Sequence, residues 1–103
     1  MFRSRNVAAL AEEAVERLGP RDSLLFKGEP VSNVLVLERA RRLQRAFTEL
    51  GLGKDKVAAM CMINHPLVYS VFGGIFRTGG IAVPMMFQLT PAEVNYILGH
   101  TEA

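Results

Sequence analysis

The feature that most constrains this chain is a run of twenty residues, 57–76, that contains no Asp, Glu, Lys or Arg. Its length is close to that of a membrane-spanning helix. Asn64, His65 and Pro66 interrupt it near the middle, where polar side chains and a proline would leave backbone groups without partners in lipid. Each remaining half is too short to cross a bilayer. We therefore expect no transmembrane segment and interpret the run as the interior of a folded α/β structure.

The run and the residues after it predict alternating strands and helices. Residues 57–63 are apolar at odd and even positions alike, which predicts a strand buried on both faces. Residues 67–77 predict a helix that is apolar nearly all round and therefore buried. Residues 81–86 predict a second apolar strand, and Thr90 begins a helix with a capping box. This order is typical of a parallel sheet with right-handed crossovers.

The first half of the chain predicts an amphipathic helix followed by a hairpin. Asn6 is placed to cap the helix, whose apolar stripe runs to Leu18. Residues 24–26 predict a short strand, residues 27–30 form the turn, and Val31 starts the return strand.

A second helix is predicted over residues 34–50. Ser32 or Asn33 is placed to cap it, and Gly51 supplies a left-handed residue at its end. Its other face carries charged side chains, as expected for a helix at the surface. The residues expected on its apolar face are Val36, Ala40, Leu43, Phe47 and Leu50.

Charge is unevenly distributed along the chain. Residues 1–50 carry nine basic and seven acidic side chains, whereas residues 51–103 carry three of each. A length of 103 residues fits a single domain. The helices available here cannot cover two parallel strands with apolar faces, so we expect residues 1–103 to form a partial parallel sheet with flanking helices, incomplete on its own. Either further polypeptide or self-association is expected to complete it.

The single cysteine, Cys61, excludes an intramolecular disulfide. It also offers no metal-binding spacing, because His65 and His100 stand apart from it and from each other. A reducing, cytoplasmic location is expected. No continuous apolar stretch precedes Glu12, so we expect no secretory signal and a mature chain that starts at Met1.

A cluster of arginines on the second helix could contact phosphates, as in nucleic-acid-binding proteins. Glu38 and Glu49 interrupt the cluster, and the net charge of the chain is only +2. A solvated helix face is the simpler interpretation, so we expect no nucleic-acid partner. The cluster consists of Arg39, Arg41, Arg42 and Arg45.

The glycine pairs and the first histidine have structural explanations. No glycine pair stands directly between a strand and a helix, as the dinucleotide-binding fingerprint requires. Gly73 and Gly74, inside a predicted helix, favour close approach of two backbones. His65 has no Ser, Cys, Asp or Glu near it in sequence that would form a catalytic pair, so a capping role is expected, and either Asn64 or His65 is placed to cap the helix that follows.

The remaining reactive or polarizable side chains also stand alone. Cys61 is flanked by methionines and is expected to be a buried apolar filler. Met85 and Met86 could line an apolar pocket, although core positions are more common for methionines in a strand. His100 is placed to interact favourably with the negative end of the last helix. We expect no catalytic, cofactor-binding or metal-binding residues in these 103 residues.

Four segments share their order and spacing with a known family: NVAALAEEAVERLG, ERARRLQRAFTELGLGKDKVAAM, NHPLVYSVFGGIFRTGGIAVP and LTPAEVNYILGHTEA. Together they resemble the N-terminal segment of the AMP-forming acyl-CoA synthetases, the adenylate-forming acid–thiol ligases. The resemblance covers nearly the whole chain and depends on many positions rather than one motif.

The resemblance implies a two-step reaction in which ATP and a carboxylic acid give an acyl-adenylate and coenzyme A then takes the acyl group. It implies ATP, magnesium and coenzyme A for the full-length family and none bound by this segment. The family carries its phosphate loop, adenine-binding residues and catalytic lysine further along the chain, so no site residue is carried over to this sequence.

We therefore expect an N-terminal piece of an ATP-dependent fatty or carboxylic acid–CoA synthetase that is inactive alone. The alternative is a standalone homodimeric interaction module without catalysis. The acyl substrate is not specified by these residues.

Overall fold

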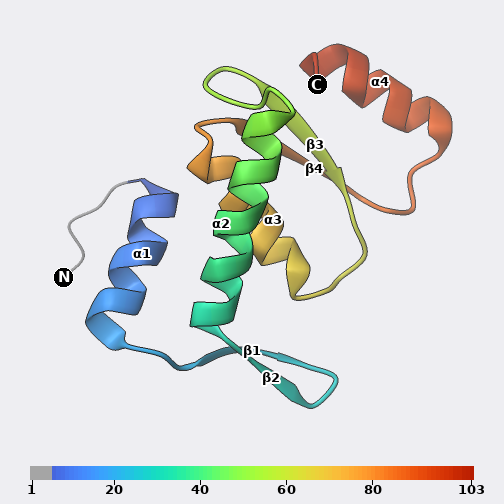
Figure 1. The fold of residues 1–103 in the computed structure, drawn as a ribbon. Coiled ribbons are helices and arrows are strands. Elements are labelled where there is room, and N and C mark those ends of the chain that lie inside the picture. Colours follow the sequence, from blue (N-terminus) through green and yellow to red (C-terminus); the bar gives the residue numbers. More distant parts are fainter. Residues whose placement is uncertain (1–5) are drawn as a thin grey trace.

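The computed structural model describes residues 6–103 and shows an α/β fold (Figure 1). The N-terminal segment, expected to hold no secretory signal, lies partly outside the described residues. The elements in chain order are α1 (Val7–Leu18), β1 (Asp22–Phe26), β2 (Glu29–Ser32), α2 (Asn33–Glu49), β3 (Val57–Cys61), α3 (Leu67–Arg77), β4 (Ile81–Met85) and α4 (Pro91–Thr101). All four predicted helices and the predicted hairpin are confirmed.

The first helix begins as the sequence predicts. The side chain of Asn6 accepts hydrogen bonds from the backbone N–H groups of Ala8 and Ala9. This satisfies two of the donors that a helix start leaves free. The helix ends at Gly19, whose φ of 71° lies in the left-handed region. No residue of α1 is buried, so the helix sits at the periphery of the fold.

The hairpin turn is shorter than predicted. Lys27 and Gly28 alone form it, with φ values of 52° and 81°. Two consecutive left-handed residues give the turn geometry that matches the twist of antiparallel strands. Pro30, expected in the turn, instead pairs with Leu25 inside β2.

The two candidate caps of α2 have separate roles. Ser32 Oγ accepts the N–H of Val34 at 3.1 Å and so caps the helix. Asn33 instead ties α2 to the end of α1, because its Oδ1 accepts the N–H of Arg21 at 3.0 Å and its Nδ2 donates to the carbonyl of Gly19 at 3.1 Å.

The end of α2 is also confirmed. Gly51 has a φ of 96°, its N–H donates to the carbonyl of Thr48, and the N–H of Leu52 donates to the carbonyl of Phe47, both at 3.0 Å. This is the pair of bonds expected where a left-handed glycine ends a helix. Leu50, however, was wrongly placed on the apolar face: it is 83% exposed, because the chain has already left the helix.

The core lies where α2 packs on α3. A methyl group on Gly73 would lie 2.9 Å from Cβ of Ala40, and one on Gly74 would lie 2.8 Å from Cβ of Leu43. The prediction that these glycines permit close backbone approach is confirmed. Ile75 beside them is 1% exposed. Buried Ser70 donates its hydroxyl to the carbonyl of Val36 at 3.0 Å, which adds a polar bond between the helices.

Strands β3 and β4 form the predicted parallel pair, in register from Val57 with Ile81 to Cys61 with Met85. The burial predicted for both faces is wrong: only Met60 of β3 is buried, and Cys61 is exposed. One crossover helix covers one face of a strand pair, and no second layer lies on the other face within residues 6–103 (Figure 1).

Helix α3 differs from its prediction in the same way. It spans the predicted residues, but only Ser70, Gly74 and Ile75 of it are buried, and Tyr69 is 57% exposed. The apolar side chains away from α2 line a groove described below.

Helix α4 begins with the predicted capping box. The side chain of Thr90 accepts the N–H of Glu93, and a carboxylate oxygen of Glu93 accepts the N–H of Thr90 at 3.0 Å. The bond from the Thr90 backbone, and then that from its hydroxyl, lower the pKa of Glu93. In the part of the chain that the structure describes, no helix is long and apolar enough to span a membrane.

The substitution Gly74→Ala tests the close approach of α2 and α3. We expect it to lower the free energy of unfolding by about 1–3 kcal/mol, because the added methyl group must push Leu43 or the helix backbone away. Chemical denaturation followed by circular dichroism measures the change. Gly99→Ala in α4 is the control, since no atom lies within 4 Å of its added Cβ. A Gly74→Ala protein as stable as the wild type would contradict the packing.

Candidate functional site

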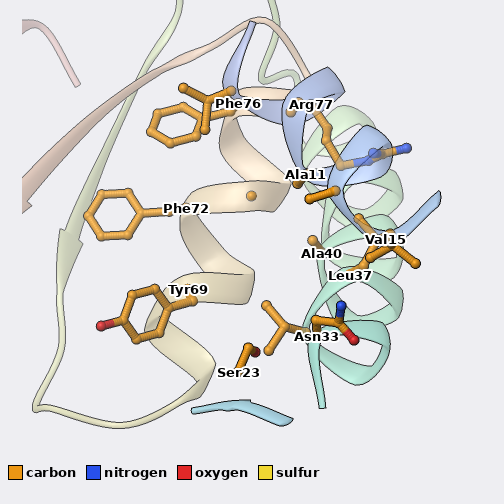
Figure 2. A pocket seen from close by; sticks show the side chains of 15 residues that line it. Ala11, Val15, Ser23, Asn33, Leu37, Ala40, Tyr69, Phe72, Phe76 and Arg77 are labelled. Atoms are coloured by element: carbon orange, nitrogen blue, oxygen red, sulfur yellow. The ribbon is translucent and has the colours of Figure 1, made fainter. Parts of the chain in front are cut away.

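An apolar groove of about 550 Å³ lies between α1 and the α2–α3 pair. Gly73 of α3 and Ala40 of α2, which approach each other closely, are both among its lining residues. Figure 2 shows aromatic rings along α3 on one side and the small side chains of α1 on another. The aromatic residues are Tyr69, Phe72 and Phe76, and the residues from α1 are Val7, Ala8, Ala11, Ala14 and Val15.

The aromatic wall is partly ordered by ring stacking. The rings of Phe72 and Phe76 lie 5.8 Å apart with an interplanar angle of 22°. Residues four apart on a helix share one face, so the two rings follow the helix axis. Polar groups in the lining are few: Ser23, Asn33 and Arg77. The groove therefore suits apolar contacts.

An ion-pair network joins α1 to the other two helices beside this groove. Glu12 of α1 accepts hydrogen bonds from Arg41 of α2, with Nε at 3.1 Å, and from Arg77 of α3, with Nη1 at 2.6 Å. Gln44 extends the network by accepting from Arg77 Nε and donating to the carbonyl of Arg77, both at 3.0 Å. One carboxylate thus connects three helices.

The charges of this network stabilise one another. The hydrogen bond from Arg41, opposed in part by desolvation and helped by the bond from Arg77, lowers the pKa of Glu12. The same bond to Glu12 raises the pKa of Arg41. The Glu12 side chain is 36% exposed, so solvent screens these interactions and each contributes modestly to stability.

The predicted arginine cluster does not converge on a common site. Arg41 binds Glu12, whereas Arg42 and Arg45 are exposed on α2 and Arg39 is half-buried. The expected solvated helix face describes Arg42 and Arg45, while Arg41 has a structural role that the sequence did not reveal.

His65 has the capping role that was predicted. Its Nδ1 accepts the backbone N–H of Leu67 at 3.0 Å at the start of α3. Its ring also packs edge-on against Phe26 of the hairpin, with 5.1 Å between ring centroids. The bond to Leu67 requires the Nδ1 lone pair, so the proton of neutral His65 lies on Nε2.

The expected burial of Cys61 is wrong. The side chain is exposed, with Sγ 3.7 Å from the carbonyl oxygen of Met86. Met85 is half-buried and Met86 is 66% exposed, so neither is a core residue here. His100 stacks on Tyr96 near the end of α4, with 5.7 Å between ring centroids. The strands at Cys61, Met85 and Met86 are covered by the described chain on one face only.

No group of three or more His, Cys, Asp or Glu that could hold a metal ion occurs within residues 6–103. Neither the groove nor the Glu12 network was predicted from the sequence. The groove depends on small residues of α1 facing aromatic residues of α3, and Glu12 lies 65 residues from Arg77. The apolar periodicity of each helix was predictable from the sequence, but which helix faces pack against each other was not.

Comparison with known proteins identifies the family. A family described as AMP-binding enzymes matches residues 11–103. The chain belongs to the AMP-binding enzyme family.

Two curated relatives show the range of this family. A medium/long-chain-fatty-acid–CoA/3-oxocholest-4-en-26-oate–CoA ligase of Mycobacterium marinum is 29% identical over 98 residues, which are 94% of this chain and 18% of that protein. Tyrocidine synthase 3 of Brevibacillus parabrevis is 29% identical over 94 residues, 91% of this chain and 1% of that protein. The chain thus spans less than a fifth of the length of either relative.

Two solved structures show the same fold. The N-terminal subdomain of Klebsiella oxytoca NpsA matches with a TM-score of 0.88 at 18% identity, covering 97% of this chain and 26% of that one. The anthranilate CoA ligase AuaEII, solved with anthranoyl-AMP, matches with a TM-score of 0.85 at 21% identity, covering all of this chain and 20% of that one. The predicted α/β class is confirmed.

The stabilisation that the Glu12 network provides is expected to depend on pH. Because the folded pKa of Glu12 is lowered, its stabilisation is present above the unfolded value of about 4.3 and is lost as the pH falls through the folded pKa. We expect Glu12→Gln to lower the free energy of unfolding by about 0.5–1 kcal/mol at pH 7. The difference from wild type should shrink between pH 7 and an acidic pH below the folded pKa of Glu12, where both side chains are neutral.

Denaturant titrations at both pH values measure this difference. Glu16→Gln, on the exposed side of α1, is the control for removing an acidic charge from the same helix. A Glu12→Gln deficit that is equal at both pH values would contradict the ionic origin of the stabilisation.

Proposed function

We propose that the chain is the N-terminal scaffold segment of an ATP-dependent acyl-CoA synthetase. The single observation that supports this is the family match over residues 11–103, together with curated relatives named as acid–CoA ligases. In the proposed reaction a carboxylate attacks the α-phosphate of ATP to give an acyl-adenylate and pyrophosphate. The thiol of coenzyme A then takes the acyl group and releases AMP.

The described residues do not fit ATP. The groove between α1 and the α2–α3 pair has apolar walls, which offer few donors to phosphate oxygens. The guanidinium groups of Arg41 and Arg77 at its side already bind Glu12, whose carboxylate would repel a phosphate. At the start of α3 the N–H of Leu67 is bonded to His65. We therefore assign no step of the reaction, and no bound magnesium, to residues of this chain.

The proposed contribution of the chain is structural. Helices α2 and α3 and the β3–β4 pair form a rigid layer, and the remainder of a synthetase would add the strands and the nucleotide-binding residues. A fatty acid is the proposed substrate class, on the basis of the ligase names among the relatives. The cytoplasmic location expected from the single cysteine stays a prediction.

One observation favours a second candidate, a homodimeric interaction module without catalysis. Several large apolar side chains near the ends of the parallel strands are exposed, namely Ile63, Ile81, Met86 and Phe87. A surface of this kind is typical of a protein that binds another chain.

A chimera tests the scaffold role. We expect the Mycobacterium marinum ligase to retain fatty-acid-dependent ATP–pyrophosphate exchange when its matching 98 residues are replaced by this chain. The ligase lacking those residues, without replacement, is the inactive control. A folded chimera without exchange activity would contradict the proposal.

The chain alone is the second arm of this test. We expect the purified 103-residue polypeptide to show no ATP–pyrophosphate exchange with any acid, because residues 6–103 offer no phosphate site. Measurable exchange would overturn the proposed inactivity.

A further inference from the structure

Helix α1 is joined to α2 at its C-terminal end by backbone and amide groups. At the start of α2, Asn33 donates its Nδ2 to the carbonyl of Gly19 at 3.1 Å and accepts the N–H of Arg21 at its Oδ1 at 3.0 Å. The backbone N–H of Asn33 also donates to the carbonyl of Arg21 at 2.9 Å. These bonds use no charged side chain, so they hold the end of α1 on α2 whatever the charges elsewhere on the helix.

The attachment in the middle of α1 is ionic. Glu12 accepts hydrogen bonds from Arg41 of α2 and Arg77 of α3, and the two guanidinium groups approach it from different helices. The side chain of Glu12 is 36% exposed and that of Arg41 is 50% exposed, so solvent screens the pair. This attachment depends on charge, whereas the one at Asn33 does not.

The start of α1 lies over hollows and not over a packed core. The apolar groove separates α1 from the α2–α3 pair. A second hollow, of about 440 Å³, is lined by the start of α1 and the end of α3, including Ala9 and Thr78. No residue of α1 is buried. Because hydrophobic stabilisation follows the apolar area removed from water, moving the start of α1 outward costs little of it.

The helical structure of α1 is supported by local bonds. Asn6 caps the helix by accepting the N–H groups of Ala8 and Ala9. Within the helix, Arg17 pairs with Glu13 one turn earlier at 3.3 Å. These bonds do not require α2 or α3, so α1 can move as one unit about its attached end, as hinged elements do.

We propose that α1 is a hinged strap over the apolar groove, with its pivot at Asn33 and its latch at Glu12. When the carboxylate of Glu12 leaves Arg41 and Arg77, the start of α1 swings away from α2 and α3 while its end stays in place. The swing separates the small side chains of α1 from the aromatic residues of α3 and opens the groove to solvent (Figure 2). The inference is independent of the proposed function, since pivot, latch and groove all belong to this chain.

Two pairs of spin labels distinguish a hinge from general loosening of the helix. In a Cys61→Ser background, Ala9→Cys with Glu49→Cys reports on the start of α1. In the same background, Leu18→Cys with Leu35→Cys reports on its attached end. All four labelled positions are exposed. Double electron–electron resonance measures the distance within each pair.

The charge reversal Glu12→Arg opens the latch, because it places a third cation beside Arg41 and Arg77. We expect a longer distance to become the main one for the pair at the start of α1, while the distance at the attached end stays unchanged. The milder Glu12→Gln should raise the ratio of the longer to the shorter distance about two- to fivefold. A folded Glu12→Arg protein with wild-type distances, or an equal change in both pairs, would overturn the proposal. If Glu12→Arg does not fold, the ratio measured for Glu12→Gln decides the matter.

A matched control and a charge exchange identify the latch. Glu16→Arg makes the same change of charge at an exposed position of α1 and should leave both distances unchanged. Adding Arg77→Glu to Glu12→Arg exchanges the two charges and should restore the shorter distance, because opposite charges again meet between α1 and α3. A folded double variant that keeps the longer distance would contradict the assignment of Glu12 as the latch.

Nile red, an uncharged dye that fluoresces in apolar surroundings, measures the opening of the groove without labels on the chain. We expect higher dye fluorescence with Glu12→Arg than with the wild type or Glu16→Arg, while the circular dichroism of all three stays the same. Equal fluorescence of the three folded proteins would show that the groove does not open and would overturn the proposal.

Discussion

The close approach of α2 and α3 is the constraint on which the rest of the structure depends. Gly73 and Gly74 let the α3 backbone come within contact distance of Ala40 and Leu43, and the buried hydroxyl of Ser70 adds a bond between the helices. Helix α3 also connects β3 to β4, so its position fixes the strand pair. The network around Glu12 then places α1 against both helices. A change at the glycines would therefore disturb α1 and the strand pair as well.

The uneven distribution of charge follows from this arrangement. The first half supplies peripheral helices, one of which has no buried residue, and these need charged outer faces. The second half supplies a strand pair and a helix that the chain covers on one side only. Side chains suited to an interior, such as Ile63 and Phe87, therefore remain exposed. The chain matches only about a quarter of the NpsA subdomain.

Local features such as helix caps were predictable from the sequence. The burial of side chains and the contacts between residues distant in sequence were not. The caps at Asn6, Ser32 and Thr90 and the glycine end of α2 depend on residues a few positions apart, so each was readable directly. Burial of Cys61 was wrongly expected, because an apolar strand becomes an interior strand only when a second layer covers it. The bond from Arg77 to Glu12 spans 65 residues and has no periodic signature.

The position of Glu12 has a consequence for the order of assembly. Its carboxylate accepts from one arginine on α2 and another on α3, so the binding geometry exists only after those two helices have packed together. Helix α1 buries no residue that would hold it there earlier. We therefore expect α1 to dock after α2 and α3 have packed, and its backbone amides to exchange with solvent sooner than those of these two helices.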